Sequence, residues 1–352
     1  MMRDRARGAI EGFSTKMLSS ADDKPRQEGG RMAHRIRWGV MGCARIARMQ
    51  VVPAIGRCAN ATLQAVASRD QGKLTEFRNL FGEFTAHSTY QALIDDPSVD
   101  AIYLPLPNSM HWEWAIKAMH KGKHVLCEKP LALNAGEAEK MVRTARECGV
   151  RLMEAFMYRY TDRTKKIVEV LDSGVLGEIR CINSTFRFFL DRENTIKENP
   201  ELGGGALYDV GCYPLNLIGL VTREEPVSVV VECAKSHGVD VNLSAILRYP
   251  SGLIASLHCG LNAFGRISSE ITGSKGLLLV PDTFLDNAGQ IQLVTDKGTE
   301  MIVVAESDRY AAEITDFSTA ILEKREPALS LDESLRNMRV LERLVAARDK
   351  IR

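Results

Sequence analysis

Hydrophobic positions in the first half of the chain form short continuous runs, several of them separated by segments with helical periodicity. Such runs indicate strands that are buried on both faces of a sheet. They lie at residues 36–41, 63–67, 100–105, 123–126 and 150–154. Because strands that alternate with helices of about 10 to 15 residues form βαβ units, this half is expected to be a doubly wound parallel sheet.

The pattern changes after about residue 157, and apolar and polar residues alternate in the second half. Alternation over 239–248 resumes at 253–261 beyond a Pro-Ser-Gly turn, which predicts a hairpin with one buried face. An α+β domain with an open, mostly antiparallel sheet is therefore expected. Its further strands are expected at 178–189, 227–236, 267–273 and 289–305, and its helices at 161–173, 308–324 and 331–348.

These patterns divide the chain into a leader at residues 1–34, a first domain at 35–157 and a second domain at 158–352. The leader mixes acidic and basic residues with little periodicity, so it is expected to be disordered. Met32 is an alternative natural start for the protein, which leaves open whether the preceding residues are native.

The composition narrows the classes of function. A formal net charge of +1 gives no field that would recruit nucleic acid or an anionic membrane. No apolar run approaches the ~18 residues that a membrane helix needs. The eight cysteines are scattered without a CxxC pair, which favours reduced thiols, a cytoplasmic location and no metal site.

The first strand leads into a glycine-rich turn at residues 42–47. The dinucleotide fingerprint G-x-G-x-x-G/A fits Gly42 and Ala47, but Ala44 replaces the second glycine. The methyl group of Ala44 takes some of the room that a pyrophosphate would use. The motif alone is weak, and its place between a strand and a helix supports a nucleotide-binding turn.

The second strand ends in three polar residues that bear on the choice of cofactor. An acid at this tip binds the ribose 2′-hydroxyl of NAD, and an arginine accommodates the 2′-phosphate of NADP. Ser68 and Arg69 therefore favour NADP. Asp70 keeps NAD open, although its side chain could instead cap the next helix.

A lysine follows the strand at 123–126, in the sequence Cys127-Glu128-Lys129-Pro130. Loops after strand C-termini of an open parallel sheet bind ligands, and the proline keeps Lys129 in an extended backbone. The Lys129 ammonium is therefore expected to project into a crevice. Taken alone, these four residues more often form a solvated turn.

A second unusual stretch runs from Gly203 to Tyr213. Its three consecutive glycines are expected to let backbone approach a ligand, and the residues after them read as a helix. Asp209 and Tyr213 are four residues apart and share one helix face, where a carboxylate and a phenol could position and protonate a substrate oxygen. The alternative is that Asp209 complements the helix dipole while Tyr213 packs in the core.

Together these stretches resemble the glucose–fructose oxidoreductase/inositol dehydrogenase (Gfo/Idh/MocA) family of NAD(P)-dependent oxidoreductases. The resemblance rests on residues 39–47, Glu128-Lys129-Pro130, 154–159 and 203–213. It implies an N-terminal Rossmann domain and a C-terminal domain whose open sheet supports a homodimer or homotetramer. Tyrosine at 213 looks more like the branch of xylose dehydrogenases, dihydrodiol dehydrogenases and deoxysugar 3-ketoreductases, which commonly prefers NADP, with NAD as the alternative.

The resemblance also implies roles for site residues. Lys129 would stabilise the alkoxide-like oxygen and share its proton, and burial and the nicotinamide cation would lower the pKa of this lysine. Tyr213 would relay the proton. Asp209 would orient Lys129 or a substrate hydroxyl. Which of Lys129 and Tyr213 is the formal acid/base stays open. Substrate contacts are implied at Lys129, Tyr158, Arg159, Asp209 and Tyr213. Cofactor contacts are implied at Gly42, Cys43, Ala44, Arg45, Ile46, Ser68, Arg69, Leu106, Asn108, His111, Glu128 and Lys129, although His111 could equally be a helix cap.

Three functions are compatible with these features. The first is hydride transfer between nicotinamide and a small-molecule sugar or polyol, as a sugar dehydrogenase or ketosugar reductase. The second is oxidation of a trans-dihydrodiol, which an apolar cleft lined by Trp112, Phe156 and Phe188 would favour. The third is a non-catalytic NADP-sensing protein, against which the presence of Lys129 and Tyr213 speaks.

Overall fold

The computed structural model describes residues 34–191 and 195–351. The predicted disordered leader lies outside these ranges except for His34. All eight cysteines are free thiols, four of them buried, in agreement with the expected reduced state. Within the described ranges, no helix is both long enough and apolar enough to cross a membrane.

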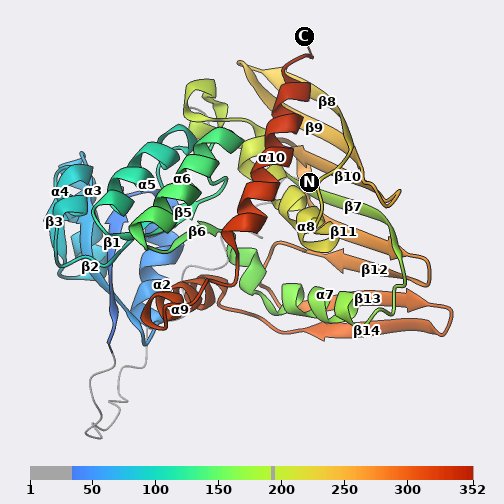
Figure 1. The fold of residues 1–352 in the computed structure, drawn as a ribbon, viewed down its shortest axis with the longest axis horizontal. Helices are drawn as coiled ribbons and strands as arrows, with labels where there is room; N and C mark the ends of the chain where they lie inside the picture. Colours follow the sequence, from blue (N-terminus) through green and yellow to red (C-terminus); the bar gives the residue numbers. More distant parts are fainter. Residues whose placement is uncertain (1–33, 192–194, 352) are drawn as a thin grey trace, which may run out of the picture. The chain divides into compact units, whose positions relative to one another are not determined.

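A parallel sheet of six strands occupies the first half of the chain (Figure 1). Its order is β3-β2-β1-β4-β5-β6, with every neighbouring pair parallel. This confirms the predicted doubly wound sheet, and the reversal of strand order between β1 and β4 creates the crevice in which such sheets bind ligands. The strands are β1 (Ile36–Met41), β2 (Ala61–Ala67), β3 (Thr85–His87), β4 (Ala101–Leu104), β5 (His124–Glu128) and β6 (Leu152–Ala155).

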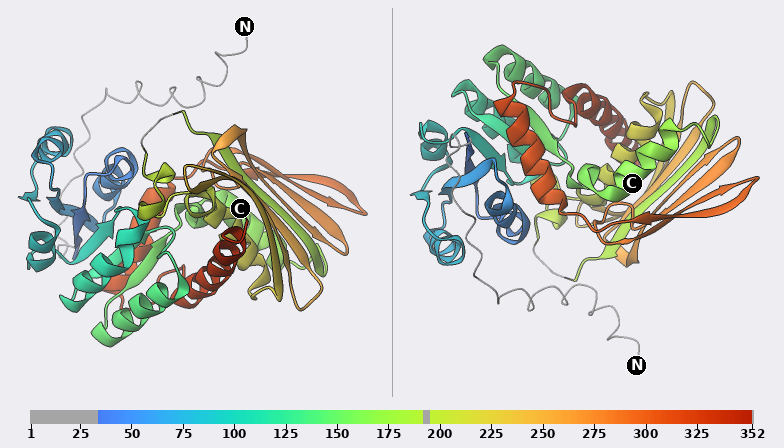
Figure 2. Two further views of the ribbon diagram at one scale, coloured as in Figure 1. Left: turned by 90° about the horizontal axis from the view of Figure 1, so that it is seen from above. Right: turned by 90° about the horizontal axis from the view of Figure 1, so that it is seen from below.

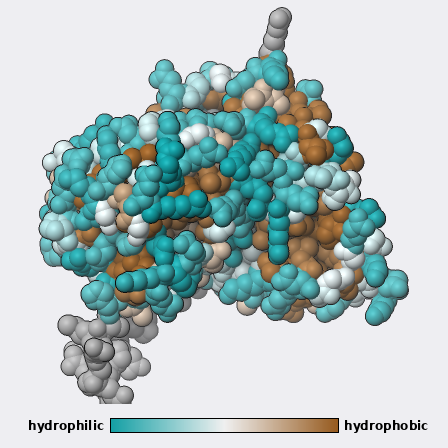
Figure 3. Space-filling model, viewed as in Figure 1, coloured by the Kyte–Doolittle hydropathy of each residue, from teal (hydrophilic) through white to brown (hydrophobic). Residues whose placement is uncertain are grey.

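Helices cover both faces of this sheet. On one face lie α5 and α6, whose outer surface is mostly hydrophilic in Figure 3. Against the other face packs a helix from far along the chain, α9, where the Trp38 indole N–H donates to Ser318 Oγ at 3.2 Å and the Trp38 ring lies 5.7 Å from that of Phe317. The helices are η1 (Ala47–Val51), α2 (Val52–Arg57), α3 (Gln71–Phe81), α4 (Tyr90–Asp95), α5 (His111–His120), α6 (Ala135–Cys148) and α9 (Arg309–Leu322).

The second sheet has eight strands in the order β14-β13-β12-β11-β7-β10-β9-β8. Only the β10–β7 pair is parallel, so the predicted open, mostly antiparallel sheet is confirmed. The predicted strand at 289–305 is a hairpin instead, because Gly298 turns the chain with a φ of 120°. The strands are β7 (Ile179–Phe189), β8 (Ser228–Ser236), β9 (Val239–Arg248), β10 (Ile254–Gly260), β11 (Asn262–Gly273), β12 (Gly276–Pro281), β13 (Gly289–Thr295) and β14 (Gly298–Val304).

Three helices, α7 (Asp162–Asp172), α8 (Cys212–Thr222) and α10 (Leu331–Arg348), cover one face of this sheet. The views in Figure 2 show α10, drawn in dark red, between the two sheets, where it contacts α6 and α8. The predicted hairpin β9–β10 buries Leu243 and Leu257 beneath the helices. Its outer face is largely polar: Ser244 and His258 share a hydrogen bond of 2.9 Å there.

Candidate active site

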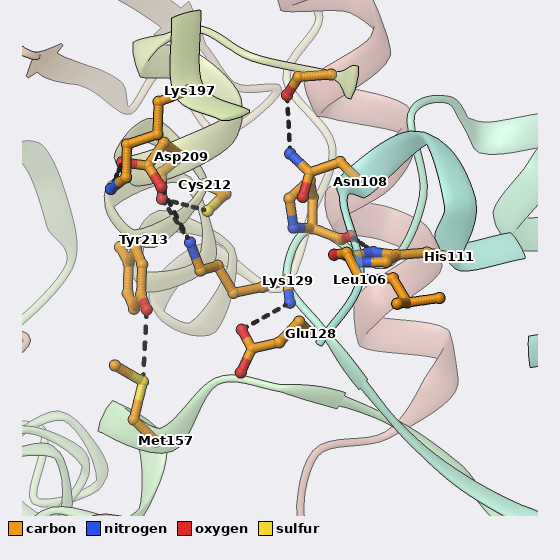
Figure 4. A network of polar contacts seen from close by, with 12 residues as sticks. Leu106, Asn108, His111, Glu128, Lys129, Met157, Lys197, Asp209, Cys212 and Tyr213 are labelled. Carbon is orange, nitrogen blue, oxygen red and sulfur yellow. Dashed lines mark hydrogen bonds and ion pairs between the residues drawn. The ribbon is translucent and has the colours of Figure 1, made fainter. Parts of the chain in front are cut away.

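The Lys129 ammonium lies where the two halves of the fold meet. It follows β5 directly, as the sequence predicts, and its side chain is only 14% exposed. Its Nζ donates to the carbonyl oxygen of Asp209 at 2.6 Å, lies 3.7 Å from Asp209 Oδ1, and sits 5.1 Å from the centre of the Tyr213 ring (Figure 4). The lysine from one motif and the aspartate and tyrosine from the other therefore converge, as expected from the sequence.

The helix that presents Asp209 and Tyr213 is irregular. A π-helical turn, η6 (Leu207–Gly211), precedes α8, and Pro214 in the first turn of α8 has no N–H to donate. The Asp209 carbonyl in this region accepts from Lys129 instead of serving only the helix. Irregular helix turns of this kind often occur at functional sites.

The three glycines before this helix pack closely against protein atoms. A Cβ at Gly203 would come within 2.9 Å of Asn108 Cβ, and one at Gly204 within 2.6 Å of the Lys197 carbonyl oxygen. A Cβ at Gly205 would collide with the carboxylate of Asp240. Glycine is needed here because protein backbone and side chains approach closely.

A second lysine, which the sequence did not indicate, completes the charged group. Lys197 Nζ donates to Asp209 Oδ2 at 2.6 Å and lies 4.9 Å from the centre of the Phe188 ring. Figure 4 shows the Asp209 carboxylate between the two ammonium groups. Lys197 is on the short η4 turn (Ile196–Glu198), and no recognisable motif surrounds it.

The charges set the protonation states of the site. Burial disfavours the ionised carboxylate, but Lys129 and Lys197 outweigh it and lower the pKa of Asp209. Burial lowers the pKa of Lys129, as expected from the sequence. In the protein without its cofactor, however, the neighbouring Cys212, Asp209 and Glu128 together outweigh burial and leave this pKa above its ordinary value.

Tyr213 is buried among aromatic rings and also lies against Lys129. Its ring lies 5.3 to 5.5 Å from the rings of Phe156, Phe186 and Phe284. Its hydroxyl donates to the sulfur of Met157 at 3.4 Å, a weak acceptor. Burial raises the pKa of Tyr213 well above its ordinary value, so the phenol is protonated at neutral pH.

His111 holds two loops together. Its fully buried ring has Nε2 at 2.8 Å from the Leu106 carbonyl oxygen and Nδ1 at 2.9 Å from that of Pro130. These loops follow β4 and β5, so the ring fixes the backbone next to Lys129. Because its side chain has no exposed surface, the His111 ring does not support the predicted contact with a cofactor.

Other predicted residues near the crevice are engaged with protein. Asn108 Nδ2 donates to the Gly203 carbonyl oxygen at 2.8 Å and ties the β4 loop to the glycine segment. Glu128 accepts from the Tyr103 hydroxyl at 2.6 Å and from the Lys129 backbone N–H at 3.3 Å. Of these two side chains, only that of Glu128 contacts Lys129.

The two predicted substrate contacts that follow the first sheet, Tyr158 and Arg159, are engaged with protein side chains. The Tyr158 side chain has no exposed surface, and its hydroxyl donates to Asn216 Oδ1 at 2.6 Å. Arg159 pairs with Glu333 and donates to the same Asn216 oxygen. These placements do not support substrate contacts; the two residues join α8 to α10.

The predicted nucleotide turn has the geometry that a dinucleotide requires. Gly42 has a φ of 108° and donates its N–H to the Ala67 carbonyl at 2.8 Å, and a Cβ there would lie 3.2 Å from Leu106. Cys43 and Ala44 form the turn, and the helix begins at Arg45. The N–H groups of a first helical turn have no partner within the helix and suit a phosphate. The residues present therefore fit a dinucleotide at this turn.

A pocket of about 290 Å³ lies beside this turn, where the adenosine end of a dinucleotide binds in such folds. Asp70 is committed to capping α3, because its carboxylate accepts from the Lys73 backbone N–H at 3.1 Å. The Arg69 guanidinium lies 5.8 Å from the centre of the Tyr90 ring. The pocket is lined by Cys43, Ser68, Arg69, Asp70, Lys73 and Tyr90.

Comparisons with known proteins agree with this architecture. Residues 36–156 match the family described as "Oxidoreductase family, NAD-binding Rossmann fold", and residues 164–279 match the "GFO/IDH/MocA C-terminal domain". A dTDP-3,4-didehydro-2,6-dideoxy-alpha-D-glucose 3-reductase from Actinomadura kijaniata is 33% identical over 90% of this chain and 97% of its own. A D-xylose 1-dehydrogenase (NADP(+)) from Haloferax volcanii is 32% identical over 87% and 95%.

Among solved structures, a 3-ketoreductase from Actinomadura kijaniata in complex with NADP and TDP-benzene superposes with a TM-score of 0.83. It is 32% identical, and the match covers 90% of this chain and 98% of that one. Further structures of that enzyme carry a substitution of one tyrosine (TM-score 0.83) or of one lysine (TM-score 0.80). From these matches, the chain belongs to the Gfo/Idh/MocA family of NAD(P)-dependent oxidoreductases.

Proposed function

We propose that this protein is an NADP-dependent oxidoreductase that transfers a hydride between nicotinamide and a hydroxyl or carbonyl carbon of a sugar or polyol, as a ketosugar reductase or sugar dehydrogenase. The observation that carries this is the position of Lys129. Its ammonium lies at the carboxyl end of β5, held by Asp209 and packed on Tyr213, at the crevice where a dinucleotide fits.

The mechanism follows from the charges. The bound nicotinamide supplies or accepts the hydride. Lys129 stabilises the negative charge that develops on the substrate oxygen, since a preorganised cation in a site shielded from water acts strongly on such charge. Tyr213 or Lys129 donates the proton in the reductive direction, because the raised pKa values of both groups favour their protonated forms at neutral pH. Asp209 orients Lys129 through its carbonyl and carboxylate oxygens.

Two observations support these roles in Lys129 and Tyr213. In the 3-ketoreductase from Actinomadura kijaniata, the substituted lysine and tyrosine are separated by the same number of positions as Lys129 and Tyr213 here. That enzyme was also captured with NADP and TDP-benzene. A deoxysugar carried on a nucleotide is therefore a substrate class to test first.

The preference for NADP rests on the pocket beside the second strand. Arg69 and Lys73 supply two cations that suit a 2′-phosphate, and the Asp70 carboxylate that would bind a 2′-hydroxyl is already engaged as a helix cap. Ser68 adds a hydroxyl beside them. NAD has no 2′-phosphate to pair with these two cations.

The trans-dihydrodiol alternative loses its main support in the structure. Phe156 is buried against Tyr213, while Lys140 sits 5.3 Å from the centre of the Trp112 ring. Phe188 lies under Lys197. The three aromatic side chains each have a different partner, so they do not support a shared apolar cleft.

The test is a hydride-transfer screen of the purified protein with NADP(H) and NAD(H) against nucleotide-linked ketosugars, pentoses, hexoses, inositols and dihydrodiols. The expected result is turnover of a sugar with NADP(H) that Lys129→Met lowers by about 10³-fold, with cofactor affinity nearly intact. Full activity of Lys129→Met would remove the lysine from the chemistry. Cofactor binding without turnover of any substrate would favour the NADP-sensing alternative.

A further inference from the structure

We propose that Lys197 is a positioning residue for the reaction, which acts on Lys129 through the Asp209 carboxylate that the two lysines share. This role rests on the function proposed above. It places in the site a residue from the 195–205 segment, which is far from both the nucleotide turn and the lysine loop in sequence.

The contacts define how Lys197 acts. It donates to Asp209 Oδ2 at 2.6 Å, while Lys129 lies 3.7 Å from the other oxygen, Oδ1. Each carboxylate oxygen thus faces its own ammonium group. The shorter contact fixes the rotation of the carboxylate and leaves Oδ1 toward Lys129.

The backbone of Lys197 is itself anchored to the helix that carries Asp209. Its carbonyl accepts from the Gly205 N–H at 2.8 Å, and Gly204 has no Cβ because the same carbonyl lies against it. Thr195 and Glu198 close the turn as a reciprocal cap. The lysine therefore approaches Asp209 from a braced turn rather than from a free loop.

A second cation changes the electrostatics of Lys129. One carboxylate facing one ammonium favours the charged form of that ammonium. The added cation of Lys197 opposes this effect, so that Lys129 gives up its proton more readily than it would beside Asp209 alone. The other titratable side chains that influence Lys129 are Glu128, Glu154, His111, Cys212 and Tyr213.

The experiment compares the pH–rate profiles of substrate oxidation with NADP⁺ for wild type, Lys197→Met and Lys197→Arg. Removing the Lys197 cation should shift the limb of the pH–rate profile that reports ionisation of Lys129 to higher pH by about one unit. At pH values below that limb, kcat should fall roughly 3- to 10-fold. Lys197→Arg should restore the position of the limb, since it restores the charge. The dissociation constant of NADP⁺ should change less than about twofold, because Lys197 contacts Asp209 and not the nucleotide turn.

A matched control is Lys166→Met, which removes a lysine from an ion pair of similar length, 2.9 Å to Glu169, on the surface of α7. It should leave the profile unchanged. A limb that stays in place in Lys197→Met, or one that Lys197→Arg fails to restore, would overturn the proposal even if kcat falls.

A second measurement does not require turnover. The Lys129 signal in ¹³Cε-lysine NMR of the NADP⁺ complex is the one missing from Lys129→Met, and it should titrate about one pH unit higher in Lys197→Met than in wild type. An unchanged titration refutes the role of Lys197. Absence of turnover with every sugar, together with the expected shift, would instead refute the proposed function alone.

Discussion

Replacing Asp209 by asparagine removes the anion that separates two ammonium groups. The carboxylate lies 3.7 Å from Lys129 Nζ and 2.6 Å from Lys197 Nζ, and its side chain is 17% exposed. Two unit charges about 4 Å apart interact by about 4 kcal/mol at an effective dielectric constant of about 20. Asp209→Asn removes this interaction from Lys129, and exposure to water reduces it to about 2 to 3 kcal/mol, or about two units of the Lys129 pKa.

The sign follows from the charge. Loss of a carboxylate favours the neutral amine, so the pKa of Lys129 should fall in Asp209→Asn, opposite to the rise expected for Lys197→Met. The limb of the pH–rate profile for oxidation with NADP⁺ should move down by about two units. The control is Asp172→Asn, because Asp172 lies 3.8 Å from Arg223 but is 65% exposed, so that its loss should have little effect.

One result would refute this reasoning. If Asp209→Asn lowers kcat while the limb stays at its wild-type pH, then Asp209 does not set the charge state of Lys129, and its role is limited to the shape of the helix. Circular dichroism and cofactor binding of the variant would show that the fold is intact before this conclusion is drawn.

Four further changes test other parts of the structure. Arg69→Ala should weaken NADP by about 10- to 100-fold and leave NAD nearly unchanged, measured as KM for each cofactor; equal losses for both would contradict a 2′-phosphate contact. Asp240→Asn should lower the free energy of unfolding by about 3 kcal/mol in urea denaturation, because the fully buried Asp240 carboxylate pairs with Arg348 at 2.8 Å; a loss below about 1 kcal/mol would contradict this. Burial opposes ionisation of Asp96, but hydrogen bonds from Ser98 and His87 lower its pKa from 3.8 to about 2. The ionised carboxylate therefore contributes of order 2 kcal/mol to the free energy of unfolding above about pH 4, and this contribution is lost as the pH falls through about 2. The free energies of unfolding of wild type and Asp96→Asn should become equal near pH 2, and a difference that does not depend on pH would refute this. Ile246 is 53% exposed on the outer face of the second sheet and pairs across the strands with Val230, which is also exposed. If this face is the interface of a homodimer or homotetramer, Ile246→Lys should shift the protein toward monomer in light scattering.

Periodicity located most strands because burial on one or both faces leaves a direct mark on residue order. The hairpin β9–β10 and the helix α10 begin and end within a few residues of their predicted bounds. β3 was not predicted, since it has three residues and lies at the sheet edge with little burial. β12 was also not predicted, although its apolar run Leu277–Val280 was a usable signal.

Asn134 to Glu137 and Ser330 to Glu333 have the sequence pattern of a capping box, in which one side chain caps the helix and a carboxylate three residues later returns to the cap residue. Asn134 accepts from the Glu137 N–H at 2.9 Å, but Glu137 returns to Leu133 rather than to Asn134. Ser330 caps α10 as expected, whereas the carboxylate of Glu333 pairs with Arg159 instead of completing the box. The N-cap contact is local and depends on sequence alone, while the returning carboxylate takes whichever partner the tertiary structure brings near.

The sequence by itself determined the parallel sheet, the lysine after β5 and the positions of the acid and the phenol four residues apart. The alternation of strands and helices along the chain, the position of a loop after a strand and the spacing of residues in a helix are all local properties of the chain. Only the tertiary structure decided that Lys197 faces Asp209, that His111 is buried between two carbonyl groups and that Tyr158 and Arg159 both hydrogen-bond to Asn216. These outcomes depend on which distant segments meet. A polar side chain whose role the sequence leaves open either contacts the candidate site or is buried with a hydrogen-bond partner, and the neighbours that the fold brings to it decide which.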